Sequence, residues 1–85
     1  MTASQRLADM GYEDVIIFSN PGYDEALIGV SEDNRAIYDF DQMVECLILH
    51  DGFLYDEAVE WIEYNTIRAL PYAGEKAPII MYRLR

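Results

Sequence analysis

The sequence has little basic charge, a single cysteine and no long apolar run. It contains six Lys and Arg residues against sixteen Asp and Glu, a formal net charge of −10 at pH 7. Because nucleic acids and anionic lipid headgroups are bound largely through basic side chains, this shortage argues against direct binding of DNA, RNA or a membrane surface. The longest apolar stretches, 15–18 and 77–82, are far shorter than the roughly 20 residues that cross a bilayer. We therefore predict a soluble protein.

The lone cysteine, Cys46, rules out an internal disulfide, and the sequence lacks the basic, apolar and small-residue order of a signal peptide. Both observations favour a reducing compartment, so we expect a cytoplasmic protein. The only histidine, His50, lies four residues after Cys46. Two ligands are too few for a zinc site, and an activated cysteine needs an orienting third group. We interpret Cys46 as a packing residue and His50 as a helix C-terminal residue.

Neighbouring carboxylates such as Asp39 and Asp41 lack the loop spacing of a calcium site. The chain also has no glycine-rich phosphate loop, because Gly74-Glu75-Lys76 lacks the other residues of that motif. We therefore predict no catalytic residue, no metal site and no cofactor, and a protein that is not an enzyme.

What the sequence does contain is enough apolar surface for one core. Half of the chain, 52%, is apolar and 13% is aromatic, which is too rich for intrinsic disorder. Its length fits one domain of marginal stability. We predict a single α+β domain over residues 1–85, with residues 1–12 as a short N-terminal helix capped by Ser4 or as a loosely attached segment.

Local patterns predict three strands, then two helices, then a closing strand. The expected strands are 15–19, 26–31 and 35–40, the last two joined as a hairpin by the polar turn 32–34, and 79–84 after Pro78. The first expected helix runs from 42 to about 50, with Asp41 as its N-cap, and its core-facing residues are Met43, Val44, Leu47 and Ile48. The second runs from near Tyr55 toward Ala69, and its core-facing residues are Tyr55, Ala58, Val59 and Ile62. We therefore predict a small antiparallel sheet of about four strands with the helix pair packed on one face.

Acidic charge is concentrated along the chain. Fifteen of the sixteen acids lie between residues 9 and 63, where Arg35 is the only Lys or Arg. Asp56, Glu60 and Glu63 recur at i, i+4 and i+7, which places them on one helix face although like charges at this spacing destabilise a helix. The face is interpreted either as a solvated surface that aids solubility or as a binding surface for a basic partner.

Two tyrosines accompany the acidic face. Tyr64 directly follows Glu63, and Tyr72 follows Pro71 in a segment that also holds Asn65 and Arg68. Exposed tyrosines with a charged rim are typical of protein-binding sites. The predicted partner-binding residues are Asp56, Glu60, Glu63, Tyr64 and Tyr72. The alternative is that Asn65 and Thr66 satisfy backbone groups and that Arg68 pairs with a nearby acid. Tyr64 would then cap the core together with Trp61.

Four segments together resemble a family of small uncharacterised proteins encoded by bacteriophages and prophages. They are Phe18-Ser19-Asn20-Pro21, Ile28-Gly29-Val30-Ser31, Ala36-Ile37-Tyr38-Asp39 and Asn65-Thr66-Ile67-Arg68-Ala69-Leu70-Pro71-Tyr72, and the resemblance spans roughly residues 15–82. Leu54 departs from the family pattern, which has Thr or Ser before the second helix. The resemblance implies no residue role. It implies the host bacterial cytoplasm, where small acidic phage proteins often inhibit nucleic-acid enzymes or defence systems, anti-CRISPR proteins among them.

The sequence thus favours a non-enzymatic acidic protein that binds a basic surface of a host protein. It would act as an inhibitor of a nucleic-acid-binding or defence protein, similar to an anti-CRISPR protein or a DNA mimic. The alternative is a small structural or regulatory homodimer, joined through a sheet edge or an aromatic patch, whose charge serves only solubility.

Overall fold

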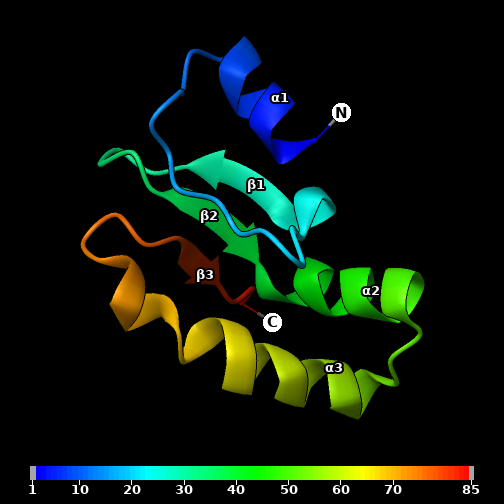
Figure 1. Cartoon of the computed structure of the whole chain (residues 1–85). Coiled ribbons are helices and arrows are strands. Elements are labelled where there is room, and N and C mark those ends of the chain that lie inside the picture. The colour runs from blue at the N-terminus through cyan, green and yellow to red at the C-terminus, as the bar shows by residue number, and fades with distance from the viewer. Residues whose placement is uncertain (1, 85) are drawn as a thin grey trace.

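The computed structural model describes residues 2–84. Within these residues the chain forms a three-stranded sheet of order β1-β2-β3, flanked by helices (Figure 1). β1 (Leu27–Val30) and β2 (Ala36–Asp39) pair in antiparallel fashion, and β3 (Ile79–Met81) pairs with β2 in parallel. The predicted α+β class is confirmed, whereas the predicted antiparallel sheet of about four strands is wrong in strand number and in the direction of its last strand.

The first helix, α1 (Ala3–Asp9), begins two residues earlier than an N-cap at Ser4 would place it. Thr2 is the N-cap, because its hydroxyl accepts the Gln5 N–H while the Gln5 side chain accepts the Thr2 N–H. Ser4 lies inside the helix. α1 is attached to the rest of the chain through buried Ala3 and Leu7.

The predicted hairpin is confirmed at its turn and in its pairing. The polar turn 32–34 contains Asn34 at a φ of 63°, in the left-handed region that asparagine tolerates. β1 and β2 pair from Val30 and Ala36 at the turn to Leu27 and Tyr38 at the far end, with a bulge between Leu27 and Gly29.

The segment Val15–Ser19, expected to be a strand, is extended but belongs to no sheet. Its Phe18 N–H donates to the hydroxyl of Tyr38, 3.2 Å away, where a sheet would offer a strand carbonyl. The Phe18 ring lies 4.6 Å from the Tyr38 ring, centroid to centroid. Val15, Ile17 and Phe18 pack against the core, whereas Ile16 is exposed. A β-branched composition alone therefore does not require a neighbouring strand.

β2 continues directly into α2 (Phe40–Asp51). Asp39, not Asp41, is the N-cap, since its Oδ1 accepts the Asp41 N–H at 3.1 Å. Asp39 is buried, and Arg83 donates to its Oδ2 from Nε at 2.8 Å and also from Nη2. The predicted inner face of α2 is confirmed, and Gly52 ends the helix at a φ of 71°.

The second long helix changes its hydrogen-bonding pattern midway. α3 (Tyr55–Trp61) continues as the π-helix η2 (Ile62–Ile67), and η3 (Leu70–Ala73) is a 3₁₀ turn that contains Pro71. The Asn65 amide donates to the Trp61 carbonyl at 3.0 Å, which diverts that carbonyl from the regular backbone ladder. Ala58 and Ile62 face the core as predicted, but Tyr55, at the first position of α3, is 60% exposed.

The path of these helical segments explains why β3 is parallel to β2. α3 runs back along α2, and η2 and η3 carry the chain beyond the start of α2 (Figure 1). The chain therefore re-enters the sheet opposite the beginning of β2, where Ile79 pairs with Ile37, and runs in the same direction.

The core lies between the sheet and the helices. Its largest fully buried side chains are Tyr38, Met43, Leu47 and Ile62. No helix within residues 2–84 is long and apolar enough to cross a membrane.

Candidate functional site

The predicted acidic residues lie on the outer side of α3 and η2, which we call the acidic face: Asp56, Glu60 and Glu63. All three side chains are exposed. Ala58 and Ile62, between them in sequence, point to the core, so helical geometry turns the acids to solvent. No ion pair joins these three carboxylates to a basic side chain within residues 2–84. Their negative charge is therefore not neutralised by the fold.

The two predicted tyrosines differ in their surroundings. Tyr64 is 64% exposed, and the Arg68 guanidinium lies 5.6 Å from the centre of its ring. Through this cation–π contact, a positive charge lies next to Tyr64, at the C-terminal end of the acidic face. Tyr72 is 91% exposed and lies in η3, outside the helical run that carries the acids. The structure therefore places Tyr64 beside the acidic face, and Tyr72 in a separate element.

Several basic side chains are engaged by backbone carbonyls and not by carboxylates. Arg6 donates to the carbonyls of Asp24 and Leu27, at 3.0 and 2.8 Å. Arg35 and Lys76 each donate to one carbonyl, those of Ala77 and Asp33, at 2.8 and 2.6 Å. Such bonds tie distant segments together, and within residues 2–84 none of these three basic side chains forms an ion pair with a carboxylate. Among residues 2–84, Arg83 is the Lys or Arg residue that forms an ion pair, with Asp39 and Asp41.

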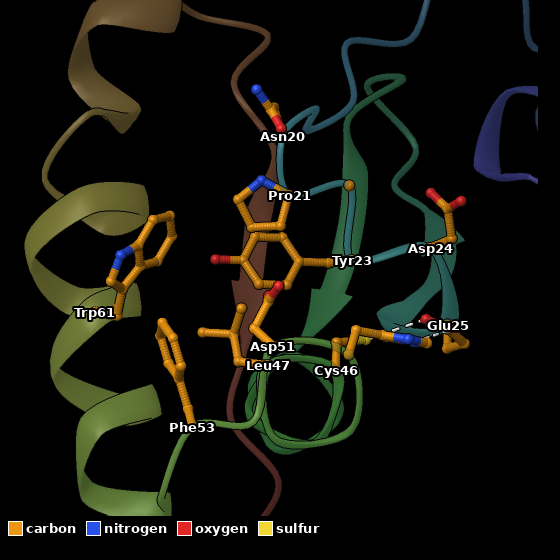
Figure 2. Close-up of a pocket in the computed structure, with 12 residues that line it drawn as sticks. Asn20, Pro21, Tyr23, Asp24, Glu25, Cys46, Leu47, Asp51, Phe53 and Trp61 are labelled. Atoms are coloured by element: carbon orange, nitrogen blue, oxygen red, sulfur yellow. Dashed lines mark hydrogen bonds and ion pairs between the residues drawn. The ribbon is translucent and has the colours of Figure 1, made fainter.

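A pocket of about 700 Å³ is lined by Trp61 of α3 but by no residue of the acidic face, and no sequence pattern indicated it. It is bounded by the loop before η1 (Asp24–Ala26), by η1 itself, by the C-terminal half of α2 and by Trp61 (Figure 2). Figure 2 shows the rings of Trp61 and Phe53 on one side and Tyr23 across from them, with Asp51 extending from the end of α2 toward the Tyr23 ring. Because the chain segments involved are far apart in sequence, no local pattern indicated this grouping.

Tyr23 is fixed in the pocket wall by an unusual backbone and a buried hydrogen bond. Its φ is 51°, in the left-handed region that is unfavourable for a bulky residue. Its hydroxyl bonds the Thr66 hydroxyl at 2.8 Å, and its ring meets the Phe18 ring edge-on at 5.7 Å. Burial raises the pKa of Tyr23, so the phenol is neutral near pH 7. The ring is therefore an immobile wall and not an acid or base.

Glu25 joins Cys46 and His50 at the side of the pocket opposite Trp61. The Cys46 thiol donates to Glu25 Oε2 at 3.2 Å, and His50 Nε2 lies 3.0 Å from Glu25 Oε1. The Cys46 hydrogen bond, followed by a backbone bond and by His50, lowers the pKa of Glu25. Burial, followed by the Glu25 carboxylate, raises the pKa of Cys46 to about 12. The sequence analysis interpreted Cys46 as a packing residue and His50 as a helix C-terminal residue, and it did not indicate Glu25, which comes from η1.

This geometry makes Cys46 a poor nucleophile, because the attacking species is the thiolate. We expect native Cys46 to react with a small aromatic disulfide reagent at pH 8 at least about tenfold more slowly than in the urea-unfolded chain. Glu25→Gln removes the carboxylate and should accelerate the native reaction, whereas Glu13→Gln, an exposed control, should not. Equal rates in the native and unfolded chains would show that the thiol is neither buried nor suppressed.

Within residues 2–84, no group of three or more His, Cys, Asp or Glu side chains is arranged to hold a metal ion. Comparisons with protein-family models, with curated proteins and with solved structures found no match to the chain. The functional proposals below therefore depend on the residues and the geometry described above.

Proposed function

We propose that this chain is a non-enzymatic binding protein whose acidic face engages a basic surface of another protein. The observation that carries the proposal is that the carboxylates of the acidic face are exposed and form no ion pair within residues 2–84, while three basic side chains donate to backbone carbonyls. An uncompensated negative surface attracts a basic groove, increases the rate of encounter and repels phosphates. Direct binding to nucleic acid and to anionic membranes is therefore disfavoured.

The partner class that fits best is a host protein that handles nucleic acid, including a defence protein. Such proteins present basic grooves to phosphates, and a row of exposed carboxylates competes for the same groove. The resemblance to phage and prophage proteins supports this class and, with it, action in the bacterial cytoplasm. In this proposal the chain is an inhibitor similar to a DNA mimic or an anti-CRISPR protein, with Tyr64 and Tyr72 as aromatic contacts beside the charges.

The proposal is tested by capture from bacterial lysate on the immobilised protein. We expect the wild type to retain nucleic-acid-binding proteins at low salt and to release them at high salt, since screening weakens exposed charge pairs. The triple variant Asp56→Asn, Glu60→Gln, Glu63→Gln should lose most of this capture.

The matched control is the triple variant Asp9→Asn, Glu13→Gln, Asp14→Asn, which removes the same charge from exposed positions near the N-terminus. It should retain capture, because those acids lie outside the acidic face. Equal loss in both triple variants would indicate a net-charge effect, and capture that is indifferent to salt and to the face variant would refute the proposal.

A homodimeric interaction module is the second candidate, favoured by exposed apolar side chains near the α2–α3 turn. Leu49 and Leu54 are 73% and 71% exposed, and Leu49 lines a surface hollow together with Tyr55. Sedimentation at increasing protein concentration discriminates the two candidates, because a dimer interface requires association at high concentration.

A further inference from the structure

The pocket lined by Trp61 combines aromatic rings with carboxylates and has no Lys or Arg in its wall. Its rings belong to Tyr23, Phe53 and Trp61, and the Phe53 and Trp61 centroids lie 6.4 Å apart in an edge arrangement. Such rings present electron-rich faces that attract cations. Phe53 and Trp61 are partly exposed, whereas Tyr23 is only 3% exposed, so the first two rings are the ones that favour an organic cation over an anion.

The negative charge of the pocket also favours a cation. Asp24, Glu25 and Asp51 line it, and within residues 2–84 no ion pair joins Asp24 or Asp51 to a basic side chain. Glu25 is already bonded to Cys46 and His50, so it is the less available acid. Asp51 extends among the rings toward Tyr23 (Figure 2), which puts an available carboxylate beside aromatic surface.

We propose that this pocket binds a guanidinium or alkylammonium group, with Asp51 as the counter-charge and Trp61 and Phe53 as the aromatic walls. A volume of about 700 Å³ accommodates an arginine or lysine side chain with ordered water. A guanidinium matches both parts of the wall, because it stacks on rings and forms paired hydrogen bonds to a carboxylate. The carboxylates are too dispersed to chelate a metal ion.

This inference goes beyond the proposed function, since the pocket is separate from the acidic face and needs no protein partner to be occupied. The cation has two sources: a free small amine, or a basic side chain that a partner protein inserts. In the second case the pocket would anchor one residue of the partner while the acidic face receives its other charges.

The protein carries its own reporter, because Trp61 is the only tryptophan. Its fluorescence is measured while N-acetyl-arginine amide is added, and N-acetyl-citrulline amide serves as the uncharged probe of nearly the same shape. We expect a saturable change with the arginine probe, with a dissociation constant on the order of 1 mM, and at least about tenfold weaker binding of the citrulline probe. Equal binding of the two probes would overturn the proposal.

Two variants locate the cation. Asp51→Asn should weaken the arginine probe at least about tenfold, whereas Asp56→Asn, which removes the same charge from α3 outside the pocket, should change binding less than about twofold. Phe53→Leu keeps an apolar residue but removes a ring, and should also weaken binding. If Asp51→Asn and Asp56→Asn have the same effect, the cation binds to diffuse negative charge and not in the pocket.

The two sources are separated by spermidine and by the peptide acetyl-Gly-Arg-Gly-amide. Tighter binding of the peptide than of the single amino-acid probe indicates a protein side chain, and tighter binding of spermidine indicates a free amine. The face variant Asp56→Asn, Glu60→Gln, Glu63→Gln should still bind the probes, so failure of the pocket and failure of the proposed function give different results.

Discussion

Replacing Leu47 with alanine is expected to lower the free energy of unfolding by about 3 kcal/mol. Leu47 lies on the inner side of α2 and is 2% exposed, among the largest fully buried side chains of the protein. The substitution removes buried methyl groups and leaves a cavity that the surrounding helices and sheet fill only in part. For a domain of this length the loss corresponds to a fall in melting temperature of about 15 °C, measurable by circular dichroism.

The matched control lies two residues along the same helix. Leu49 is 73% exposed, so Leu49→Ala removes the same atoms from a position in contact with water. It should change the unfolding free energy by less than about 0.5 kcal/mol. Similar losses at both positions would contradict the orientation of α2, and with it the position of the pocket that α2 lines.

Replacing Asp39 with alanine is expected to destabilise the fold by about 2 kcal/mol. Asp39 is 2% exposed and has two functions at the junction of β2 and α2. Its carboxylate caps α2 by accepting the Asp41 N–H, and it also accepts hydrogen bonds from Arg83, beyond the end of β3. The alanine variant loses both contacts, which chemical unfolding in urea measures as a lower midpoint.

Asp39→Asn separates the two functions, because an amide oxygen still caps the helix while the negative charge opposite Arg83 is lost. We expect an intermediate stability for this variant. An asparagine variant as unstable as the alanine variant would assign the whole effect to the Arg83 contact, and a stable alanine variant would refute both functions.

The elements that sequence predicted correctly are those whose signals are local. The hairpin has its turn at Asn34, which tolerates the left-handed backbone, and α2 has its inner face at helical spacing and Gly52 at its end. Both signals lie within a few residues of the structure that they predict. The acidic residues of α3 turn outward for the same reason.

The errors concern residues whose partners are distant in sequence. The segment Val15–Ser19 has strand composition, but its Phe18 N–H bonds a tyrosine hydroxyl from β2. The direction of β3 depends on the length of helix that precedes it, including the π-helix η2, which no propensity scale predicts. The burial of Asp39 also had no signal in the sequence, because its partner, Arg83, is 44 residues away.

The candidate site also has one part that could be predicted from local sequence and another that could not. The role of Asp56, Glu60, Glu63, Tyr64 and Tyr72 in binding stays a prediction. Glu25 and the pocket near Trp61 arise only when η1, α2 and α3 meet, so neither had a signal in the sequence. The left-handed backbone conformation of Tyr23 could not be predicted from the sequence either, since glycine or asparagine is the usual residue in that conformation.

Self-association through the sheet is disfavoured at β1. Its register is interrupted by the bulge between Leu27 and Gly29, and the Leu27 carbonyl is already occupied by Arg6. Both features interfere with the regular ladder that a second copy would need. If the homodimer exists, the exposed apolar side chains near the α2–α3 turn are the better place to seek its interface.

The parallel pairing of β2 with β3 has a kinetic consequence. Residues 40–78 lie between the paired strands, so this part of the sheet closes a large loop that contains both long helices. The hairpin and the helix pair need only short-range contacts, whereas β3 must wait until that intervening chain is compact. Docking of β3, Ile79–Met81, should therefore be a late step of folding. Before that step the hairpin and the helices should already be formed, while the edge of β2 that pairs with β3 is still unpaired.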